Sequence, residues 1–342
     1  MELWSSLLCL LLICTLIQTL LSVSKSSKSK RLPPGPIPYP IVGNLLELGN
    51  KPHKSLAQLA KVHGPVMSLK LGQITTVVIS SAPMAREILQ IQDLCFSSRT
   101  IPESIKAHNH DQFSVAWLPS TTQWRNLRKI SNTHIFTTQK LDANQHLRRK
   151  KIEELLAHVQ KCCEAGHAVD IGKAAFMTTL NLLSNTVFSV DLVNPNSDAA
   201  QEFKSIFWGI MEEAGKPNLA DFFPVLKKID PQGIRRKMSY HFGKMFQIFD
   251  KFIDERLESR KTSGSVANVD VLDILLNLNQ ESQEIDMTHI KHLLLDLLVA
   301  GTDTSSNTLE WAMAEILCSP ETLSRVQAEL NQIINVKIQI LN

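Results

Sequence analysis

The 342-residue chain lacks several features that would define a protein class directly. No two cysteines have the C-x-x-C spacing of a metal site, and no internal repeat occurs. The net charge is +3, of which Lys25, Lys28, Lys30 and Arg31 alone supply four positive charges. The remainder is near −1 (3 − 4), which excludes an extended nucleic-acid-binding surface. With 13 Gly and 15 Pro, the chain also lacks the composition of a disordered protein.

One long apolar run does occur, at the start of the chain. Residues 3–23 contain no charged side chain, and about 20 apolar residues span a bilayer as a helix. The alternative, a cleaved signal peptide, would begin with basic residues, whereas Glu2 stands here, and no clear small-x-small cleavage pattern follows. We therefore predict an uncleaved transmembrane anchor. The basic cluster at residues 25–31 then places the following chain on the cytosolic side.

The cysteines agree with a cytosolic location. The six are Cys9, Cys14, Cys95, Cys162, Cys163 and Cys318. Because disulfides are rare in the cytosol, we interpret these residues as small buried hydrophobic side chains or exposed helix positions.

A basic, proline-rich stretch, residues 24–40, follows the expected anchor. Its Pro33-Pro34-Gly35-Pro36 run is stiff and cannot form a helix. Alone, such a run is compatible with a rigid spacer or with a ligand of a proline-binding module. Between an anchor and a domain, we interpret it as a hinge that fixes the angle of the domain to the membrane.

The body of the chain, residues 41–334, is predicted to be mainly helical with a small β region, a helix-dominated α+β class. Residues 66–71 and 75–80, joined by Gly72-Gln73, predict a two-stranded hairpin. Hydrophobic periodicity predicts helices over residues 123–134, 140–163, 174–190 and 201–214, and a long helix that begins at Met287.

The long helix contains the most informative residues of the chain. Residues 292–299, HLLLDLLV, are apolar enough to be buried, and residues 310–318 resume this pattern. Between them lies Ala300-Gly301-Thr302-Asp303-Thr304-Ser305. A glycine inside a helix costs about 1 kcal/mol relative to alanine, and threonine hydroxyls compete for the preceding carbonyls. Either Gly301 ends one helix and the polar residues after it cap another, or one buried helix carries a functional break.

Three segments in this order resemble the microsomal cytochrome P450 monooxygenases. The run at residues 33–36 is similar to the proline hinge of the family, and Trp124-Arg125-Asn126-Leu127-Arg128 matches its W-x-x-x-R pattern of helix C. Residues 300–305 match its oxygen-binding motif of helix I, (A/G)-G-x-(D/E)-T-(T/S), at every position. The intervening text is similar to plant members that hydroxylate terpenoids. The resemblance runs from about Leu32 to Ile334, and residues 335–342 look like no part of the family.

The resemblance implies haem b as cofactor, whose two propionate carboxylates require charged donors in a buried pocket. Arg128 follows Trp124 by one helical turn, so a guanidinium and an indole N–H share one face. Without the other motifs, the same pair would be a core tryptophan and a surface arginine. Ala300 and Gly301 have almost no side chain, and we expect them to leave room for dioxygen above the macrocycle.

Two further residues of the long helix are expected to take part in cofactor binding and catalysis. Thr304 is expected to offer a hydroxyl beside the dioxygen space, and Asp303 to pass protons from solvent. The resemblance implies hydroxylation of an unactivated C–H bond, with electrons from NADPH-cytochrome reductase. Arg125 and Lys129 are expected contacts for that partner on a basic face.

Residues 101–119 correspond to a substrate-facing loop in the family. Phe113, Val115 and Leu118 in this loop suit an apolar ligand, as do Leu297 and Ala300 on the long helix. Ordinary packing of a loop on a core is the alternative. We expect a small lipophilic substrate, a terpenoid by resemblance, and a single-pass protein of the endoplasmic reticulum membrane with its catalytic region in the cytosol.

Two parts of the family pattern are not found in this sequence. The F-x-x-G-x-R-x-C-x-G loop, which supplies the proximal thiolate of haem, is missing, and no glutamate has an arginine three positions later. We therefore expect a C-terminally truncated member, the N-terminal two-thirds of a monooxygenase, that is inactive alone. The alternatives are a genuine short product, such as a non-catalytic membrane-anchored fragment, and an unrelated anchored helical scaffold.

The missing loop makes a spectroscopic prediction. The polypeptide of this sequence, purified after expression with added haem precursor, is expected to give no thiolate-type Soret band in a reduced carbon monoxide difference spectrum. A full-length member of the family serves as the positive control. Appearance of the band would show that a cysteine of this chain ligates the iron.

Overall fold

The computed structural model describes residues 32–193, 198–263, 270–281 and 285–341. They form two compact units, each described by itself. The first unit contains the residues up to Ala107 together with Glu213–Met238, and the second contains His108–Glu212 and the residues from Ser239 onward. The expected anchor, residues 3–23, and residues 24–31 of the basic, proline-rich stretch lie outside the described residues. Within the described residues, no helix is long and apolar enough to cross a membrane.

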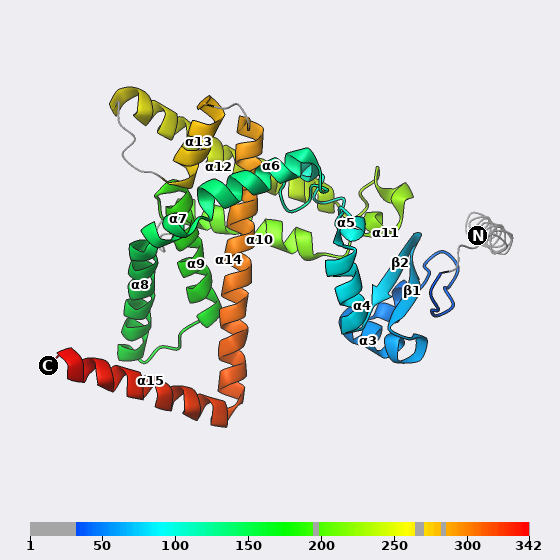
Figure 1. The fold of residues 1–342 in the computed structure, drawn as a ribbon, viewed down its shortest axis with the longest axis horizontal. Coiled ribbons are helices and arrows are strands. Elements are labelled where there is room, and N and C mark those ends of the chain that lie inside the picture. The colour runs from blue at the N-terminus through cyan, green and yellow to red at the C-terminus, as the bar shows by residue number, and fades with distance from the viewer. Residues whose placement is uncertain (1–31, 194–197, 264–269, 282–284, 342) are drawn as a thin grey trace, which may run out of the picture. The chain divides into compact units, whose positions relative to one another are not determined.

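The first unit is built around a two-stranded antiparallel sheet (Figure 1). Strand β1 (Val66–Leu71) pairs with β2 (Ile74–Ile79), and Val66 lies opposite Ile79. Its helical elements are α2 (Leu45–Leu48), α3 (Pro52–His63), α4 (Ala82–Arg86), η2 (Glu87–Ile91), α5 (Asp93–Phe96), α11 (Leu219–Phe222) and η5 (Pro224–Leu226). The predicted hairpin is confirmed, with the second strand beginning one residue earlier.

Gly72 explains how the hairpin turns. Its φ of +59° lies in the left-handed region, which glycine adopts without a steric cost. A Cβ at this position would also lie 2.7 Å from the carbonyl oxygen of Phe222. That same oxygen accepts a hydrogen bond from the Gln73 N–H (2.9 Å), so the turn packs directly on α11.

The second unit is helical and contains the long helix. Its elements are η3 (Ala107–Gln112), α6 (Thr122–Ile130), η4 (Ser131–Ile135), α7 (Thr138–Ala143), α8 (Gln145–Glu164), α9 (Ile171–Phe188), α13 (Val271–Glu281), α14 (Met287–Cys318) and α15 (Pro320–Leu341), with most of α10 (Asp198–Gly215) and α12 (Ile234–Ser263). The predicted helices are therefore present. The one expected over residues 140–163 is divided at Asn144 into α7 and α8.

The core of the second unit lies where α14 packs along α9, which in turn packs against α8 (Figure 1). Helix α14 is one continuous helix from Met287 to Cys318, so the interpretation that Gly301 ends a helix is wrong. The polar residues do not cap a new helix because their hydroxyls bond within α14. Thr304 Oγ1 donates to the carbonyl of Ala300 (2.7 Å) and Ser306 Oγ to that of Thr302 (2.9 Å).

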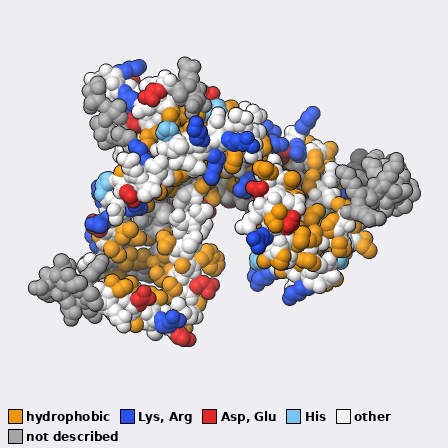
Figure 2. All heavy atoms as spheres, in the orientation of Figure 1, with side chains coloured by type: hydrophobic (Ala, Val, Ile, Leu, Met, Phe, Trp, Pro, Cys, Tyr) orange, Lys and Arg blue, Asp and Glu red, His pale blue; other side chains and the backbone are white. Residues whose placement is uncertain are grey.

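The two halves of α14 differ in exposure. Ile290, Leu294 and Leu298 are completely buried in the first half. In the second half, the exposed apolar side chains are Leu309, Trp311, Met313 and Leu317. Figure 2 shows apolar side chains gathered on this side of the unit, between α8, α9, α14 and α15. The buried half therefore anchors α14, and the second half presents an apolar surface.

A buried ionic network joins α12 to α13. Arg256 pairs with Asp270 (2.8 Å) and with Asp273, and also donates to the backbone carbonyl of Phe188 (3.0 Å). Arg260 pairs with Asp273 as well (2.6 Å). The hydrogen bond to Asp270 raises the pKa of the Arg256 guanidinium above its ordinary value. Both carboxylates are almost fully buried, so removing the cation would leave uncompensated buried charge.

Replacement of this cation tests the network. Arg256→Met is expected to lower the free energy of unfolding by about 3–5 kcal/mol in urea denaturation. Lys244→Met on the same helix is the control, because Lys244 pairs with Glu202 at an exposed site (3.8 Å) and should cost less than about 1 kcal/mol. Equal losses in the two variants would contradict a special role of the buried network.

Candidate functional site

Helix α6 presents the Trp124 and Arg128 side chains on one face, as predicted. Thr121 caps the N-terminus of this helix, and its hydroxyl accepts the Trp124 backbone N–H. The Arg128 guanidinium carbon lies 5.8 Å from the centre of the Trp124 ring, which is a cation–π distance. The Arg128 side chain is exposed and has no ion-pair partner among the described residues. Its guanidinium is therefore available to a carboxylate.

The indole of Trp124 has a different neighbour from the one expected. Its only N–H donates to the backbone carbonyl of Val115 (3.0 Å). In this structure the indole N–H thus binds the loop before α6 and is not directed at a site for a haem carboxylate. A role of Trp124 in cofactor binding stays a prediction.

On α14, the expected oxygen-binding residues divide between an open and a packed side. Ala300 and Thr304 are exposed one turn apart, and Asp303 is half-buried. Gly301 faces α9, where a Cβ would lie 2.7 Å from Leu183 Cδ1. This corrects the expected reason for the glycine: its missing side chain makes room for Leu183, and only Ala300 leaves open space.

Sequence reasoning missed Thr302. It is completely buried, and its hydroxyl has no hydrogen-bond partner among the described residues. An unpaired buried hydroxyl costs free energy, so this position is under strain or is satisfied by solvent. The only available signal was its place in the polar interruption, which does not distinguish the buried side of a helix from the exposed one.

The loop at residues 101–119, expected to face substrate, packs against the first half of α14. The Phe113 ring stacks on His292, with centroids 5.1 Å apart, and the Val115 N–H donates to Asp296 Oδ2 (2.8 Å). Leu118 and Leu297 are half-buried. The loop and α14 thus meet next to the exposed Ala300. Sequence reasoning did not single out His292 and Asp296, although two polar residues in an apolar run were the signal.

His292 is buried in this contact and stays neutral. Burial, together with the electrostatic influence of the neighbouring His110, His108 and Lys291, lowers its pKa from 6.5 to about 3. Its Nδ1 lies 2.7 Å from Nδ1 of His110, so one of the two rings donates to the other. The arrangement places a neutral imidazole, not a cation, beneath the loop.

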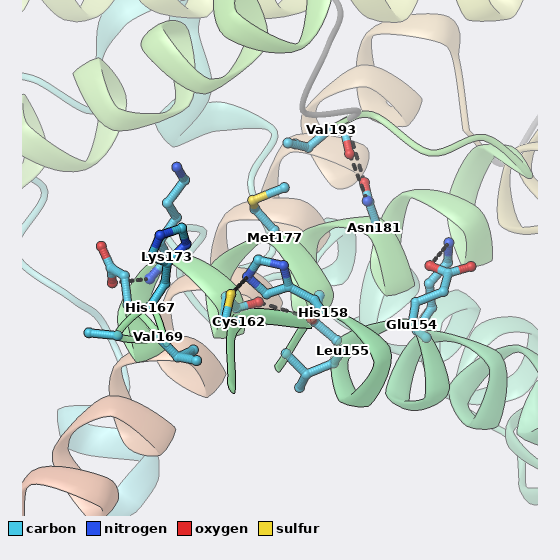
Figure 3. Close-up of a pocket in the computed structure, with 15 residues that line it drawn as sticks. Glu154, Leu155, His158, Cys162, His167, Val169, Lys173, Met177, Asn181 and Val193 are labelled. Atoms are coloured by element: carbon cyan, nitrogen blue, oxygen red, sulfur yellow. Dashed lines mark hydrogen bonds and ion pairs between the residues drawn. The ribbon is translucent and has the colours of Figure 1, made fainter. Parts of the chain in front are cut away.

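A cavity of about 490 Å³ lies elsewhere, between α8 and α9 (Figure 3). Figure 3 shows Met177 and Leu155 beside His158 and Cys162, whose side chains lie 3.9 Å apart. None of the residues predicted for the cofactor, the substrate or catalysis lines this cavity. This cavity is therefore separate from the expected site.

The described residues supply candidate contacts for only part of a bound haem. Arg128 offers a free guanidinium for a propionate, and Ala300 with Thr304 offers a small exposed surface with a hydroxyl. The described cysteines are Cys95, Cys162, Cys163 and Cys318. Cys318 follows Thr304 on the same helix by about 21 Å of rise, so the two side chains lie far apart along α14. Of the other three, Cys162 and Cys163 lie at the end of α8, and Cys95 lies on α5 of the first unit.

A helical body, a long helix with an exposed Ala–Thr stripe and a Trp–Arg face on a neighbouring helix are typical of haem monooxygenases. The chain belongs to the cytochrome P450 family, whose model matches residues 33–340. The match includes most of residues 335–342, and the boundary proposed at residue 334 stays a prediction.

The chain is similar in sequence to two hydroxylases and a deethylase. It is 58% identical over 310 residues to geraniol 8-hydroxylase from Swertia mussotii and to that from Catharanthus roseus, with 90% of this chain and 62% of each relative covered. It is 50% identical over 328 residues to 7-ethoxycoumarin O-deethylase from Helianthus tuberosus, with 95% of this chain and 66% of the relative covered. The chain thus spans less than two thirds of the length of these relatives.

The lowered pKa of His292 makes a prediction for acid stability. Between about pH 6.5 and pH 3 the unfolded state binds a proton at this residue and the folded state does not, so stability falls as the pH falls. In His292→Phe, the free energy of unfolding should fall less steeply as the pH is lowered from about 7 to 5. The slope should differ from that of the unaltered chain by at most about 1.4 kcal/mol per pH unit. Urea denaturation at several pH values measures this slope.

The matched control is His158→Phe, which removes an exposed imidazole from α8. Its pH slope should stay close to that of the unaltered chain. If His292→Phe and the unaltered chain lose stability in parallel, His292 is not a buried neutral group.

Proposed function

We propose that this chain supplies the substrate- and oxygen-facing half of a haem-dependent monooxygenase that hydroxylates a small lipophilic molecule, with a terpenoid alcohol as the favoured class. The observation that carries this proposal is the exposed stripe of Ala300 and Thr304 on α14, beside Asp303. Membership of the cytochrome P450 family supports haem as cofactor. Bound haem would supply the activation of dioxygen, in which two electrons and two protons are consumed, one oxygen atom enters a C–H bond and the other leaves as water.

The residues of the stripe have separate roles in this proposal. Ala300 keeps space free next to the helix, because its side chain is a single methyl group. Thr304 holds a hydroxyl at the edge of that space, and Asp303 on the adjoining face exchanges protons with solvent. Arg128, and Trp124 if it exchanges its backbone partner, bind the haem carboxylates.

The substrate class rests on the loop before α6 and on the relatives. Phe113, Val115 and Leu118 give this loop apolar side chains, and Leu297 adds one from α14. Two of the relatives described above carry the name of a hydroxylase of geraniol, an acyclic monoterpene alcohol. A ligand of this size and polarity suits an apolar surface with few hydrogen-bonding groups.

The proposal includes a membrane location and an electron donor. Residues 3–23 support a single-pass anchor in the endoplasmic reticulum membrane, with the described residues on the cytosolic side. Arg125 and Lys129 are exposed on α6 and suit an acidic surface of NADPH-cytochrome reductase. The polypeptide of this sequence alone is proposed to be inactive, because none of its cysteines stands in a haem-ligating loop.

A chimera tests the proposed function directly. Residues 33–334 of this chain replace the matching part of geraniol 8-hydroxylase from Catharanthus roseus, which supplies the remaining third. With reductase and NADPH, the chimera is expected to hydroxylate geraniol. Thr304→Ala in the chimera should lower the rate by about 100-fold or more, because it removes the hydroxyl next to the reacting oxygen.

The control is Thr308→Ala, one turn further along α14. Its hydroxyl makes the same kind of bond, to the carbonyl of Thr304 (2.7 Å), and this variant should keep its rate within a few-fold. A carbon monoxide difference spectrum verifies equal haem loading of both variants. Full activity of the Thr304→Ala chimera would refute the assigned role.

A further inference from the structure

A buried carboxylate occupies the contact between α14 and the loop before α6. Asp296 stands in the apolar run of α14, and its side chain is 9% exposed. Helix contacts of this kind are ordinarily made by apolar side chains. A buried carboxylate is costly unless it is paired and hydrogen-bonded, so its partners indicate its purpose.

All the described partners of Asp296 belong to residues 110–115. Oδ1 accepts the hydroxyl of Ser114 (2.7 Å), and Oδ2 accepts the backbone N–H of Val115 (2.8 Å). Nε2 of His110 lies 3.3 Å from Oδ1. Hydrogen bonds to an ionised acceptor are about twice as strong as neutral ones, so one side chain fixes three neighbouring points of the loop.

The two histidines complete a chain of donors that ends at Asp296. Because His292 stays neutral, its Nδ1–H can donate to Nδ1 of His110, whose Nε2–H then faces the carboxylate. In this order of donors, both ring nitrogens of His110 have a partner. The stacking of Phe113 on His292 places an apolar side chain of the loop on the same support.

Val115 is held from a second direction. Its N–H is bound by Asp296 on α14, and its carbonyl accepts the indole N–H of Trp124 on α6 (3.0 Å). The backbone N–H and the backbone carbonyl of Val115 are therefore both bound by side chains, one from each of two helices. The position of its side chain follows from these two bonds.

The register of α14 relates this clamp to the proposed site. Residues four apart lie on one face of a helix, so Asp296, Ala300 and Thr304 form one stripe. The loop is thus fixed one turn away from the exposed oxygen-facing residues. A shift of the loop would change which part of a bound molecule lies over Ala300 and Thr304.

We infer that Asp296 is a positioning residue for substrate, because it binds the hydroxyl of Ser114 and the backbone N–H of Val115 and thereby decides which carbon of the substrate faces Thr304. This inference deepens the proposed function and rests on it for the substrate. The clamp itself is a property of the described residues and can be tested without activity.

Hydrogen exchange of the purified chain tests the clamp. In Asp296→Ala, the Val115 amide is expected to exchange at least about ten-fold faster, since its acceptor is gone. Asp296→Asn keeps one acceptor and should give a smaller increase. Asp250→Asn is the control, because Asp250 is half-exposed and pairs with Lys291 on the surface (3.0 Å). Unchanged exchange at Val115 in both Asp296 variants, with α9 still protected, would overturn the inference.

The chimera described above tests the consequence for substrate. Asp296→Asn is expected to change the ratio of geraniol products hydroxylated at different carbons by several-fold, whereas Asp250→Asn keeps the ratio. A purely structural role would lower all products together, and that result would overturn the inference. An inactive unaltered chimera would refute the proposed function, and the exchange experiment would still decide whether Asp296 clamps the loop.

Discussion

The contact between α14 and α9 is the constraint on which the second unit depends. Two glycines allow it: Gly301 of α14 meets Leu183 of α9, and Gly172 of α9 meets the carboxyl group of Glu310 of α14. Close packing at two separate points prevents α14 from rotating about its own axis. The exposure of Ala300 and Thr304 is a consequence of that fixed rotation. Glycine in the oxygen-binding motif thus contributes to the site through helix packing.

Two ionic clusters of the second unit have different consequences. Arg256 of α12 is bound by Asp270 and Asp273 at the start of α13 and by the carbonyl of Phe188 of α9. Asp296 instead binds a loop that also carries the apolar side chains of Phe113, Val115 and Leu118. Since apolar residues of similar size often give equal or greater stability, both clusters are better explained by the geometry they specify than by stability alone.

The sequence predicted the elements of the fold better than their contacts. Alternation of apolar residues located the hairpin, and helical periodicity located α9 and α14, because both signals are local. The shared face of Trp124 and Arg128 followed from their spacing within one helix. The bond between Ser114 and Asp296 joins residues 182 positions apart, so no local pattern could indicate it. The packing of Gly301 on Leu183 was hidden for the same reason, since a glycine in a motif does not reveal what its missing side chain admits.

The hydroxyl of Thr304 has one hydrogen, and in this structure it points to the carbonyl of Ala300. What it presents to the open side of α14 is therefore a pair of lone pairs. A water molecule or an alcohol that approaches this surface therefore donates its own O–H to the oxygen of Thr304. Release of the threonine proton in the other direction requires the side chain to turn away from Ala300, so the polarity of the surface is set by a rotation about a single bond.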